Sequence, residues 1–313
     1  MTNEASQLPE LTDGVVTLRP FDAADFDSHP AGEDQESWLR FAIHHDGTTV
    51  GTAQAQRDGE VASLSWMLYA GHRGHGYASR AVRLLVAYAF EQLGVRRVEA
   101  KVDPRNAAAQ RVATRSGMHR EGLQRLEPGM ADPDDATGMV VYARLVSDLP
   151  TTEPQGFRAL LNSFLPRKRA ISQLLVRDPQ GRVLICRLTY KRDWDLPGGV
   201  VEVGESPQLA AAREVHEELA LELEAGQLLL TDWLPPWSGW DDAVCLVFDG
   251  GEHDPAIADR IHKQPREIRD AEFATAKQVR ERCADFTARR IESALANLGA
   301  GGGAMYVESG RPT

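Results

Sequence analysis

The chain has 313 residues, which is enough for two domains of ordinary size. Its formal net charge of −11 argues against a surface that binds nucleic acid or anionic membranes. No apolar run approaches the roughly 20 residues of a membrane-spanning helix, and the first residues lack the basic and apolar segments of a signal peptide. Its three cysteines are too far apart for a metal-ligand pattern, so we expect a reduced, cytoplasmic protein.

Three parts follow one another along the chain. Residues 1–148 carry mixed strand and helix signals and are predicted to form a first domain. Residues 149–164 are predicted to be a linker that ends in a short apolar helix, because their first half is polar and contains two prolines. Residues 165–313 are predicted to form a second domain. The mixture of strands and helices in both halves places the chain in the α/β (α+β) class.

In the second domain, the apolar runs 170–176 and 182–188 predict two strands. A helix is expected over 207–219, a strand over 243–248 and a C-terminal helix near 274–298. The glycine-rich tail leaves two alternatives open: it is flexible, or its Met-Tyr-Val run docks as a short edge strand.

A glycine-rich segment of the first domain lies between a predicted strand and a predicted helix. The strand covers 62–66, the loop Gly-His-Arg-Gly-His-Gly follows at 71–76, and residues 80–93 have an amphipathic helical pattern. Such a loop offers free N–H groups and the positive end of a helix dipole, which suits a pyrophosphate. It lacks the Gly-Lys-Ser/Thr of a P-loop.

This loop resembles the acyl-coenzyme A loop of the GNAT N-acetyltransferase superfamily, whose pattern is Arg/Gln-x-x-Gly-x-Gly/Ala. The resemblance covers roughly residues 15–147. Within the superfamily, this domain is similar to the branch that acetylates ribosomal-protein N-termini and related amines. It implies a mixed sheet flanked by helices, acetyl-CoA as cofactor and an amine acceptor. The cofactor-binding residues that it implies are Arg73, Gly74, Gly76, Tyr77, Ala78 and Asn106, the last on the pantetheine arm.

The sequence leaves the activity of the first domain open. Only residues 20–40 separate Arg19 from Phe41, where family members usually have two longer helices that form much of the acceptor pocket. The central strand carries no acid that could act as general base. Glu60 lies just before that strand, where a hairpin-surface glutamate is the simpler interpretation.

The most informative pattern of the chain lies in the second domain. Glu214, Glu217 and Glu218 fall at i, i+3 and i+4, so on a helix they share one face. Three like charges repel one another unless a hard divalent cation sits among them, and Mg²⁺ prefers such oxygen ligands. The preceding segment 194–199 predicts a strand that ends in a glycine turn and brings backbone carbonyls toward the same metal. A solvated acidic helix face is the alternative.

The segment resembles the Nudix box, Gly-x5-Glu-x7-Arg-Glu-U-x-Glu-Glu-x-Gly-U, in which U is aliphatic. The matching positions are Gly199, Glu205, Arg213, Glu214, Val215, Glu217, Glu218 and Leu221. Ala220 stands where the family has a glycine that ends the helix in a left-handed conformation, so we expect an altered helix end and an intact metal site.

The Nudix resemblance implies an α/β/α sandwich that hydrolyses a nucleoside diphosphate linked to a variable group X. It also implies that Mg²⁺ or Mn²⁺ is held by Glu214, Glu217, Glu218 and the Gly199 carbonyl, with Glu217 and Glu218 catalytic. Glu205 and Arg213 would orient this cluster. A later glutamate often serves as base or ligand in the family, for which Glu267 is the first choice and Glu272 the alternative.

The Nudix substrate stays open at this stage. Pro235 resembles in position the proline of ADP-ribose pyrophosphatases. Trp233, Trp237 and Trp240 could stack on a nucleobase or pack their loop against the core. The turn at 190–192 is expected near the diphosphate.

We therefore predict a bifunctional protein in which an acetyl-CoA-dependent N-acetyltransferase domain precedes a Mg²⁺-dependent Nudix hydrolase. The alternative is an active hydrolase whose first domain only binds CoA or docks a partner. The expected partners are a nucleotide-diphosphate small molecule, acetyl-CoA and an amine acceptor, with no nucleic acid and no membrane.

Overall fold

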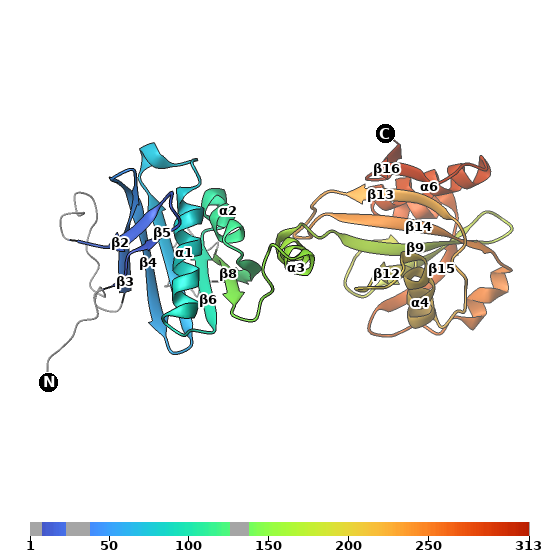
Figure 1. Ribbon diagram of the computed structural model, residues 1–313. Helices are drawn as coiled ribbons and strands as arrows, with labels where there is room; N and C mark the ends of the chain where they lie inside the picture. Colours follow the sequence, from blue (N-terminus) through green and yellow to red (C-terminus); the bar gives the residue numbers. More distant parts are fainter. Residues whose placement is uncertain (1–7, 23–37, 126–137, 313) are drawn as a thin grey trace. The chain divides into compact units, whose positions relative to one another are not determined.

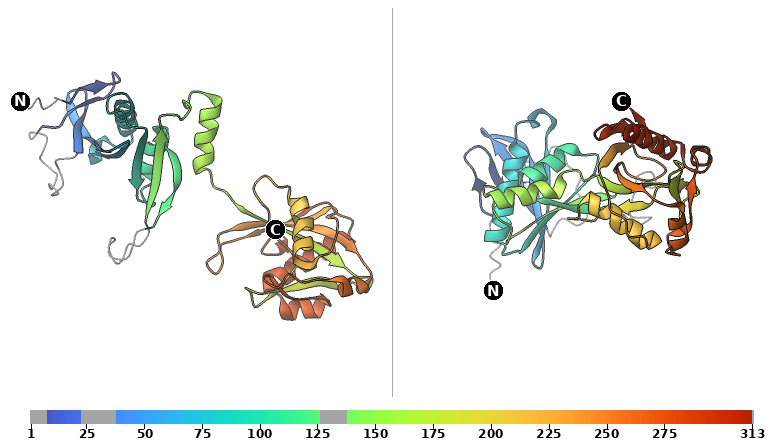
Figure 2. Two further views of the ribbon diagram at one scale, coloured as in Figure 1. Left: turned by 90° about the horizontal axis from the view of Figure 1, so that it is seen from below. Right: turned by 90° about the vertical axis from the view of Figure 1, so that its right-hand side faces the viewer.

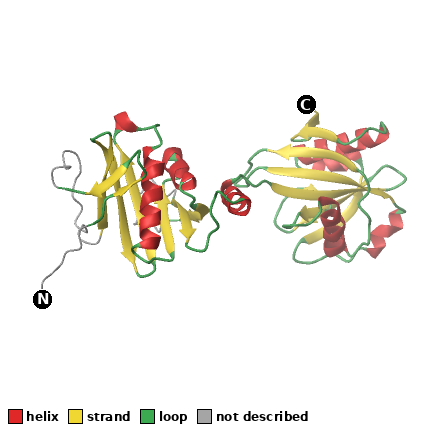
Figure 3. Cartoon of the chain, viewed as in Figure 1, coloured by secondary structure: helices red, strands yellow, loops and turns green. Residues whose placement is uncertain are grey.

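The computed structural model describes residues 8–22, 38–125 and 138–312. The chain divides into two compact units, residues 1–166 and 167–313. Each unit is a sheet flanked by helices (Figures 1 and 3). Most of the segment between Arg19 and Phe41, in which family members usually have two longer helices, lies outside the described residues.

In the described part of the first unit, eight strands form one mixed sheet in the order β1-β2-β3-β4-β5-β6-β8-β7. Only β5 and β6 pair in parallel among these neighbours, and helix α1 connects them. The strands are β1 (Leu11–Thr12), β2 (Thr17–Pro20), β3 (Trp38–His45), β4 (Thr48–Asp58), β5 (Val61–Leu68), β6 (Arg97–Val102), β7 (His119–Gln124) and β8 (Met139–Leu145).

The helices of this unit follow the apolar pattern of the sequence. A single 3-10 turn, η3 (Ala70–His72), precedes α1 (Tyr77–Glu91), which buries Val82, Leu85 and Val86 in the core formed with the sheet. Helix α2 (Ala107–Arg115) follows β6.

The segment 149–164, expected to be a linker, belongs to the first unit. Its helix α3 (Pro154–Phe164) contacts β7, and the backbone N–H of Arg120 donates to the Ser163 hydroxyl at 3.1 Å. Within this helix Leu160 is buried, whereas Phe157 is half exposed.

The second unit has a nine-stranded mixed sheet among its described residues, with the path β11-β10-β9-β14-β13-β16-β17. Strand β12 pairs with β9, and β15 pairs with β10. The strands are β9 (Arg169–Arg177), β10 (Val183–Leu188), β11 (Trp194–Asp195), β12 (Gly198–Val200), β13 (Leu228–Leu234), β14 (Ala243–Glu252), β15 (Ile268–Ala274), β16 (Met305–Glu308) and β17 (Arg311–Pro312).

Helices cover both faces of this sheet, which confirms the expected α/β/α sandwich (Figure 2). On one face α4 (Pro207–Leu219) packs Val215 and Leu219 in a cluster with Leu174. On the other, α6 (Asp285–Gly299) packs Ile291 in a cluster with Leu175. Because neighbouring residues of a strand point to opposite faces, Leu174 and Leu175 of β9 serve the two clusters.

Two sequence expectations for the C-terminal part need correction or completion. The helix expected over 274–298 is two helices, α5 (Ala276–Arg282) and α6, because Cys283 and Ala284 have extended backbone angles. The backbone of Cys283 forms an isolated β-bridge with Trp194. The Met-Tyr-Val run is strand β16, which pairs in parallel with β13. The short η4 (Pro255–Arg260) precedes β15. None of the helices within the described ranges combines the length and apolarity that a bilayer span requires.

Candidate active sites

Glu218 lies on the buried side of α4, against strand β12. The residue is 3% exposed, and its Oε2 accepts a hydrogen bond from the backbone N–H of Gly198 at 3.0 Å. Burial raises the pKa of Glu218 to about 8, the Gly198 N–H opposes this, and the charges of Glu214, Glu267 and Asp195 raise it further. A carboxyl group held in this position has a strong preference for a neighbouring cation.

Glu214 contacts the next residue of the same strand. A Cβ built on Gly199 would fall 2.5 Å from the Glu214 carboxylate, so only glycine lets the strand and the helix approach so closely. Burial raises the pKa of Glu214, Arg213 opposes this, and the charges of Glu217 and Glu267 add to the rise. Two carboxylates therefore lie against one glycine-rich strand, a set of hard oxygen donors that fits Mg²⁺ or Mn²⁺.

Glu217, the third expected ligand, pairs with Arg213. Its side chain is 56% exposed, and its Oε2 accepts a hydrogen bond from Arg213 Nη1 at 2.9 Å. Among the described residues, no group of three or more His, Cys, Asp or Glu side chains converges closely enough to hold a metal ion. The structure thus brings Glu214 and Glu218 together with Gly199, whereas Glu217 stays with Arg213.

Arg213 links the helix to the loop before it. Its Nε and Nη2 donate to the two carboxylate oxygens of Glu205 at 2.8 and 3.0 Å, and Nη2 also donates to the Val200 carbonyl at 3.3 Å. The hydrogen bonds from Arg213 to Glu205, with one from the Glu202 N–H, lower the pKa of Glu205. Arg213 and Glu205 therefore have contacts that can orient α4 relative to β12.

The two candidates for a later glutamate differ in their surroundings. Glu267 directly precedes β15, is exposed, and its charge acts on both Glu214 and Glu218. Glu272 forms an ion pair with Arg282. Of the two, Glu267 is the one whose charge acts on the carboxylate pair.

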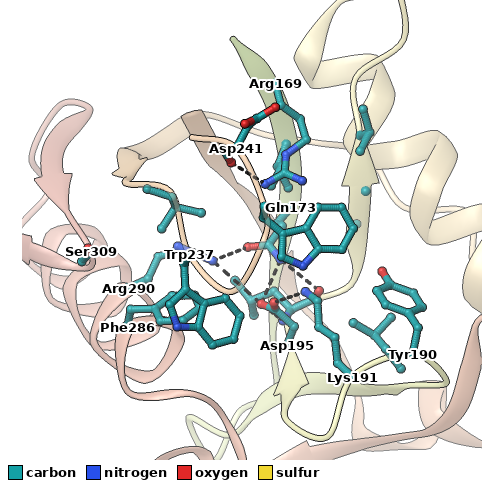
Figure 4. A pocket seen from close by; sticks show the side chains of 18 of the residues that line it. Arg169, Gln173, Tyr190, Lys191, Asp195, Trp237, Asp241, Phe286, Arg290 and Ser309 are labelled. Carbon is teal, nitrogen blue, oxygen red and sulfur yellow. Dashed lines mark hydrogen bonds and ion pairs between the residues drawn. The ribbon is translucent and has the colours of Figure 1, made fainter. Parts of the chain in front are cut away.

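A cleft opens beside β12 in the second unit (Figure 4). Its lining includes Gly199, Lys191, Trp237 and Trp240. Both tryptophans are about half exposed, at 55% and 51%, so each leaves part of its side chain accessible to a ligand. The sequence could not separate packing from ligand contact here, because a tryptophan in a loop is compatible with either.

In the first unit, the glycine loop borders another cleft. Gly74 and Gly76 have φ values of 86° and 84°, a left-handed conformation that only glycine adopts without strain. Gly76 directly precedes the first residue of α1. The residues from the loop and helix starts that line this cleft include Arg73, Gly74, Gly76, Ala78 and Asn106.

Two expected cofactor residues of this unit have other contacts in the structure. Asn106 caps α2, where its Oδ1 accepts from the Ala109 N–H at 3.0 Å, so its position is set by the helix start. The ring of Tyr77 contacts those of His45 and His75, with centroid distances of 4.4 and 5.5 Å. Its backbone still belongs to the first turn of α1.

Comparison with known families assigns both units. Residues 16–119 match the model of the acetyltransferase (GNAT) domain, and residues 166–294 match the model of the NUDIX domain. The chain joins a GNAT domain to a Nudix domain.

Relatives of known sequence match the two domains separately. The GNAT domain is 42% identical over 66 residues to the protein named "Probable N-acetyltransferase YjcK" of Bacillus subtilis, covering 21% of this chain and 36% of that protein. The Nudix domain is 36% identical over 90 residues to nucleoside triphosphatase NudI of Escherichia coli O1:K1, covering 27% of this chain and 59% of that protein. The chain thus spans less than two thirds of the length of either relative.

Among solved structures, RimJ of Mycobacterium smegmatis in complex with CoA-disulfide is similar, with a TM-score of 0.38 and 20% identity. The alignment covers 49% of this chain and 93% of that one.

The Nudix domain keeps the family's helix end in spite of Ala220. This residue has φ 56° and ψ 29°, so it adopts the left-handed conformation in which the family has glycine. The expected change in helix-end geometry is therefore wrong. Backbone N–H groups of His262 and Gln264 donate to the carbonyls of Leu219 and Glu218 at 2.9 Å each, which ties the helix end to the following loop.

Proposed function

We propose that the Nudix domain hydrolyses a nucleoside diphosphate linked to a further group X, with Mg²⁺ or Mn²⁺ held by Glu214, Glu218 and the Gly199 carbonyl. The observation that supports this most is the approach of two partly or fully buried carboxylates to Gly198 and Gly199. A structural helix would gain nothing from burying two like charges side by side.

When bound, a divalent cation supplies charge neutralisation for the diphosphate and lowers the pKa of a bound water. The protein's own residues would have three tasks. Glu214 and Glu218 hold the cation, and Arg213 with Glu205 fixes α4 against β12. Glu217 joins the ligands only if it exchanges its bond to Arg213 for the metal. Glu267 is our candidate to accept the proton of the attacking water, because its carboxylate is exposed and its charge raises the pKa of both Glu214 and Glu218.

The test is phosphate release by the purified full-length protein with Mg²⁺. The panel is ADP-ribose, NADH, nucleoside triphosphates, nucleotide sugars and CoA, with a phosphatase added where the product is a monophosphate. Glu218→Gln should reduce the rate by more than about 100-fold, since even residues outside the ligand shell cost 10–100-fold. Glu222→Gln, an exposed residue just beyond α4, is the matched control and should keep full activity. Equal rates for the two variants would contradict the proposal.

We further propose that the GNAT domain binds acetyl-CoA and transfers its acetyl group to an amine. The left-handed Gly74 and Gly76 beside the cleft support the binding step, because they leave backbone N–H groups accessible at the start of α1. Glu60, the acidic residue just before the central strand, is exposed at the hairpin between β4 and β5.

Binding and turnover separate the two alternatives for this domain. Acetyl-CoA binding is measured by calorimetry, and transfer is measured by thiol release with a panel of amines and ribosomal-protein N-terminal peptides. Gly76→Ala should weaken binding, because alanine is strained at φ 84°. Binding without transfer to any amine would favour a CoA-binding or docking module, and absence of binding would contradict both alternatives.

A further inference from the structure

The cleft of the Nudix domain has an aromatic entrance held by a tight turn. Trp237 and Trp240 exchange two backbone hydrogen bonds of 3.1 and 2.9 Å. Between them, Ser238 and Gly239 have φ values of 49° and 84°, as a type I′ turn requires. Residues paired in this way point their side chains to the same side of a hairpin, so both indoles are presented together.

Each indole is also fixed by a second contact. Trp237 meets Phe286 edge-to-face, with ring centroids 5.6 Å apart (Figure 4). The guanidinium of Arg169 lies over the ring of Trp240 at 4.7 Å. Two rigid, half-exposed indoles at the edge of a cleft form a surface on which a flat ring can stack.

Arg290 provides an unused hydrogen-bond donor at the inner end of this cleft. It is 2% exposed and lines the cleft. Its Nε donates to Asp232 at 2.8 Å and its Nη1 to Gln173 at 3.1 Å. Its Nη2 is buried and has no hydrogen-bond partner within the described residues. A buried donor without a partner is costly, so its retention points to an acceptor that arrives with the ligand.

The acceptors around Arg290 are already engaged by the protein. Asp195 accepts from Gln173 Nε2 and from the Leu196 N–H at 2.9 Å each, and its other oxygen accepts from Lys191 Nζ at 3.2 Å. Lys191 keeps further N–H groups, because an ammonium has three. The part of the cleft around Arg290 therefore offers donors to a ligand, because the carboxylate of Asp195 already accepts three hydrogen bonds from the protein. Asp241 also lines the cleft, and its backbone carbonyl accepts from Arg169.

We propose that this cleft binds the nucleobase of the substrate and selects a base with a keto oxygen, such as hypoxanthine, guanine or uracil, over adenine. The base stacks at Trp237 and Trp240, and its keto oxygen accepts from Arg290 Nη2. The 6-amino group of adenine is itself a donor and would face donors there. The inference rests on the proposed hydrolase function, because it names the nucleoside of that substrate. The proposed preference is opposite to the one that Pro235 suggests, because the position of Pro235 resembles that of a proline in ADP-ribose pyrophosphatases, whose substrate contains adenine.

The test compares inosine and adenosine monophosphates, which differ only at position 6 of the base and its neighbouring nitrogen. Their binding to the full-length protein is measured by calorimetry in EDTA, so that turnover does not contribute and the result does not depend on hydrolase activity. We expect inosine monophosphate to bind about tenfold more tightly, as one well-placed donor pair discriminates between bases. Equal affinities, tighter binding of the adenosine nucleotide, or no binding of either would overturn the proposal.

Variants separate stacking from keto recognition. Trp240→Ala should weaken both nucleotides about equally, because stacking does not depend on the edge of the base. Arg290→Lys should reduce the preference for inosine monophosphate, since it keeps a charge near Asp232 and loses the forked guanidinium. Tyr306→Ala, an exposed aromatic residue of β16, is the control and should leave both affinities unchanged. If the Arg290 variant fails to fold, the wild-type comparison decides alone.

Discussion

Gly199 and Glu214 approach each other so closely that a Cβ on Gly199 would lie 2.5 Å from the Cδ atom of Glu214. Glu214 is held there by Arg213 Nη2 at 3.0 Å, while Arg213 also binds Glu205. The strand, the helix and the loop between them therefore meet at one carboxylate. The glycine is needed for the space beside it, since its φ is not in the left-handed region.

The first prediction concerns this contact. Gly199→Ala should destabilise the Nudix domain by about 1–3 kcal/mol through overpacking and should abolish hydrolysis by displacing Glu214. Thermal unfolding and the phosphate-release assay measure the two effects. Gly303→Ala is the matched control, because a Cβ there would have nothing within 4 Å. A Gly199→Ala protein with wild-type stability and rate would show that the close approach is unimportant.

The second prediction concerns the free-energy cost of burying the Glu218 carboxyl group when no metal is bound. In EDTA, Glu218→Gln should raise the stability of the Nudix domain by about 1–3 kcal/mol, because a neutral amide replaces a carboxyl group buried beside other carboxylates. Adding Mg²⁺ should raise the melting temperature of the wild type and leave that of the variant nearly unchanged. A variant that is less stable than the wild type in EDTA would mean that Glu218 has a structural role.

The third prediction uses the strained end of α4. Because Ala220 is held at φ 56°, Ala220→Gly should stabilise the protein by about 1 kcal/mol. The same replacement inside the helix, Ala212→Gly, should destabilise it by about 1 kcal/mol. Denaturant unfolding of the two variants side by side gives opposite signs if the left-handed conformation carries strain. Two losses of stability would indicate that the helix end relaxes around alanine.

The fourth prediction concerns acid stability of the GNAT domain. Arg97 binds both oxygens of Glu121 at 2.9 and 2.7 Å, and this hydrogen bonding lowers the pKa of Glu121 below its usual range. A lowered pKa means that the unfolded state takes up the proton first. The pair therefore stabilises the fold above the ordinary glutamate pKa, and this contribution is lost as the pH falls through the lower pKa of the folded state.

The size of that effect is limited, because 44% of the Glu121 side chain is exposed, so we expect less than about 1 kcal/mol. Unfolding curves between about pH 5 and pH 3 measure it. Glu121→Gln should lose less stability over this interval than the wild type, and the control Glu91→Gln should follow the wild type. Parallel curves for all three proteins would argue against the pair.

Local patterns determined much of the Nudix half. Helix α4 begins and ends at the predicted residues, Pro207 and Leu219, because a proline at its first position and an apolar stripe are local signals. The spacing of Glu214 and Glu218 put both on one face for the same reason. Likewise, the glycine loop before α1 could be predicted, because glycine adopts the positive φ of Gly74 and Gly76 without steric strain.

Contacts between distant parts of the chain decided what the sequence could not. Arg213 draws Glu217 away from the other carboxylates, and two loop N–H groups keep Ala220 left-handed against its own preference. Arg290 reaches Gln173 across 117 positions of sequence. Gly310 in the tail donates to Asp232 at 3.0 Å, so the tail becomes part of the buried network behind the cleft. A sequence pattern reports short-range geometry, whereas the pairing of buried polar groups depends on which strands and helices become neighbours, and that is settled only when the sheet has formed.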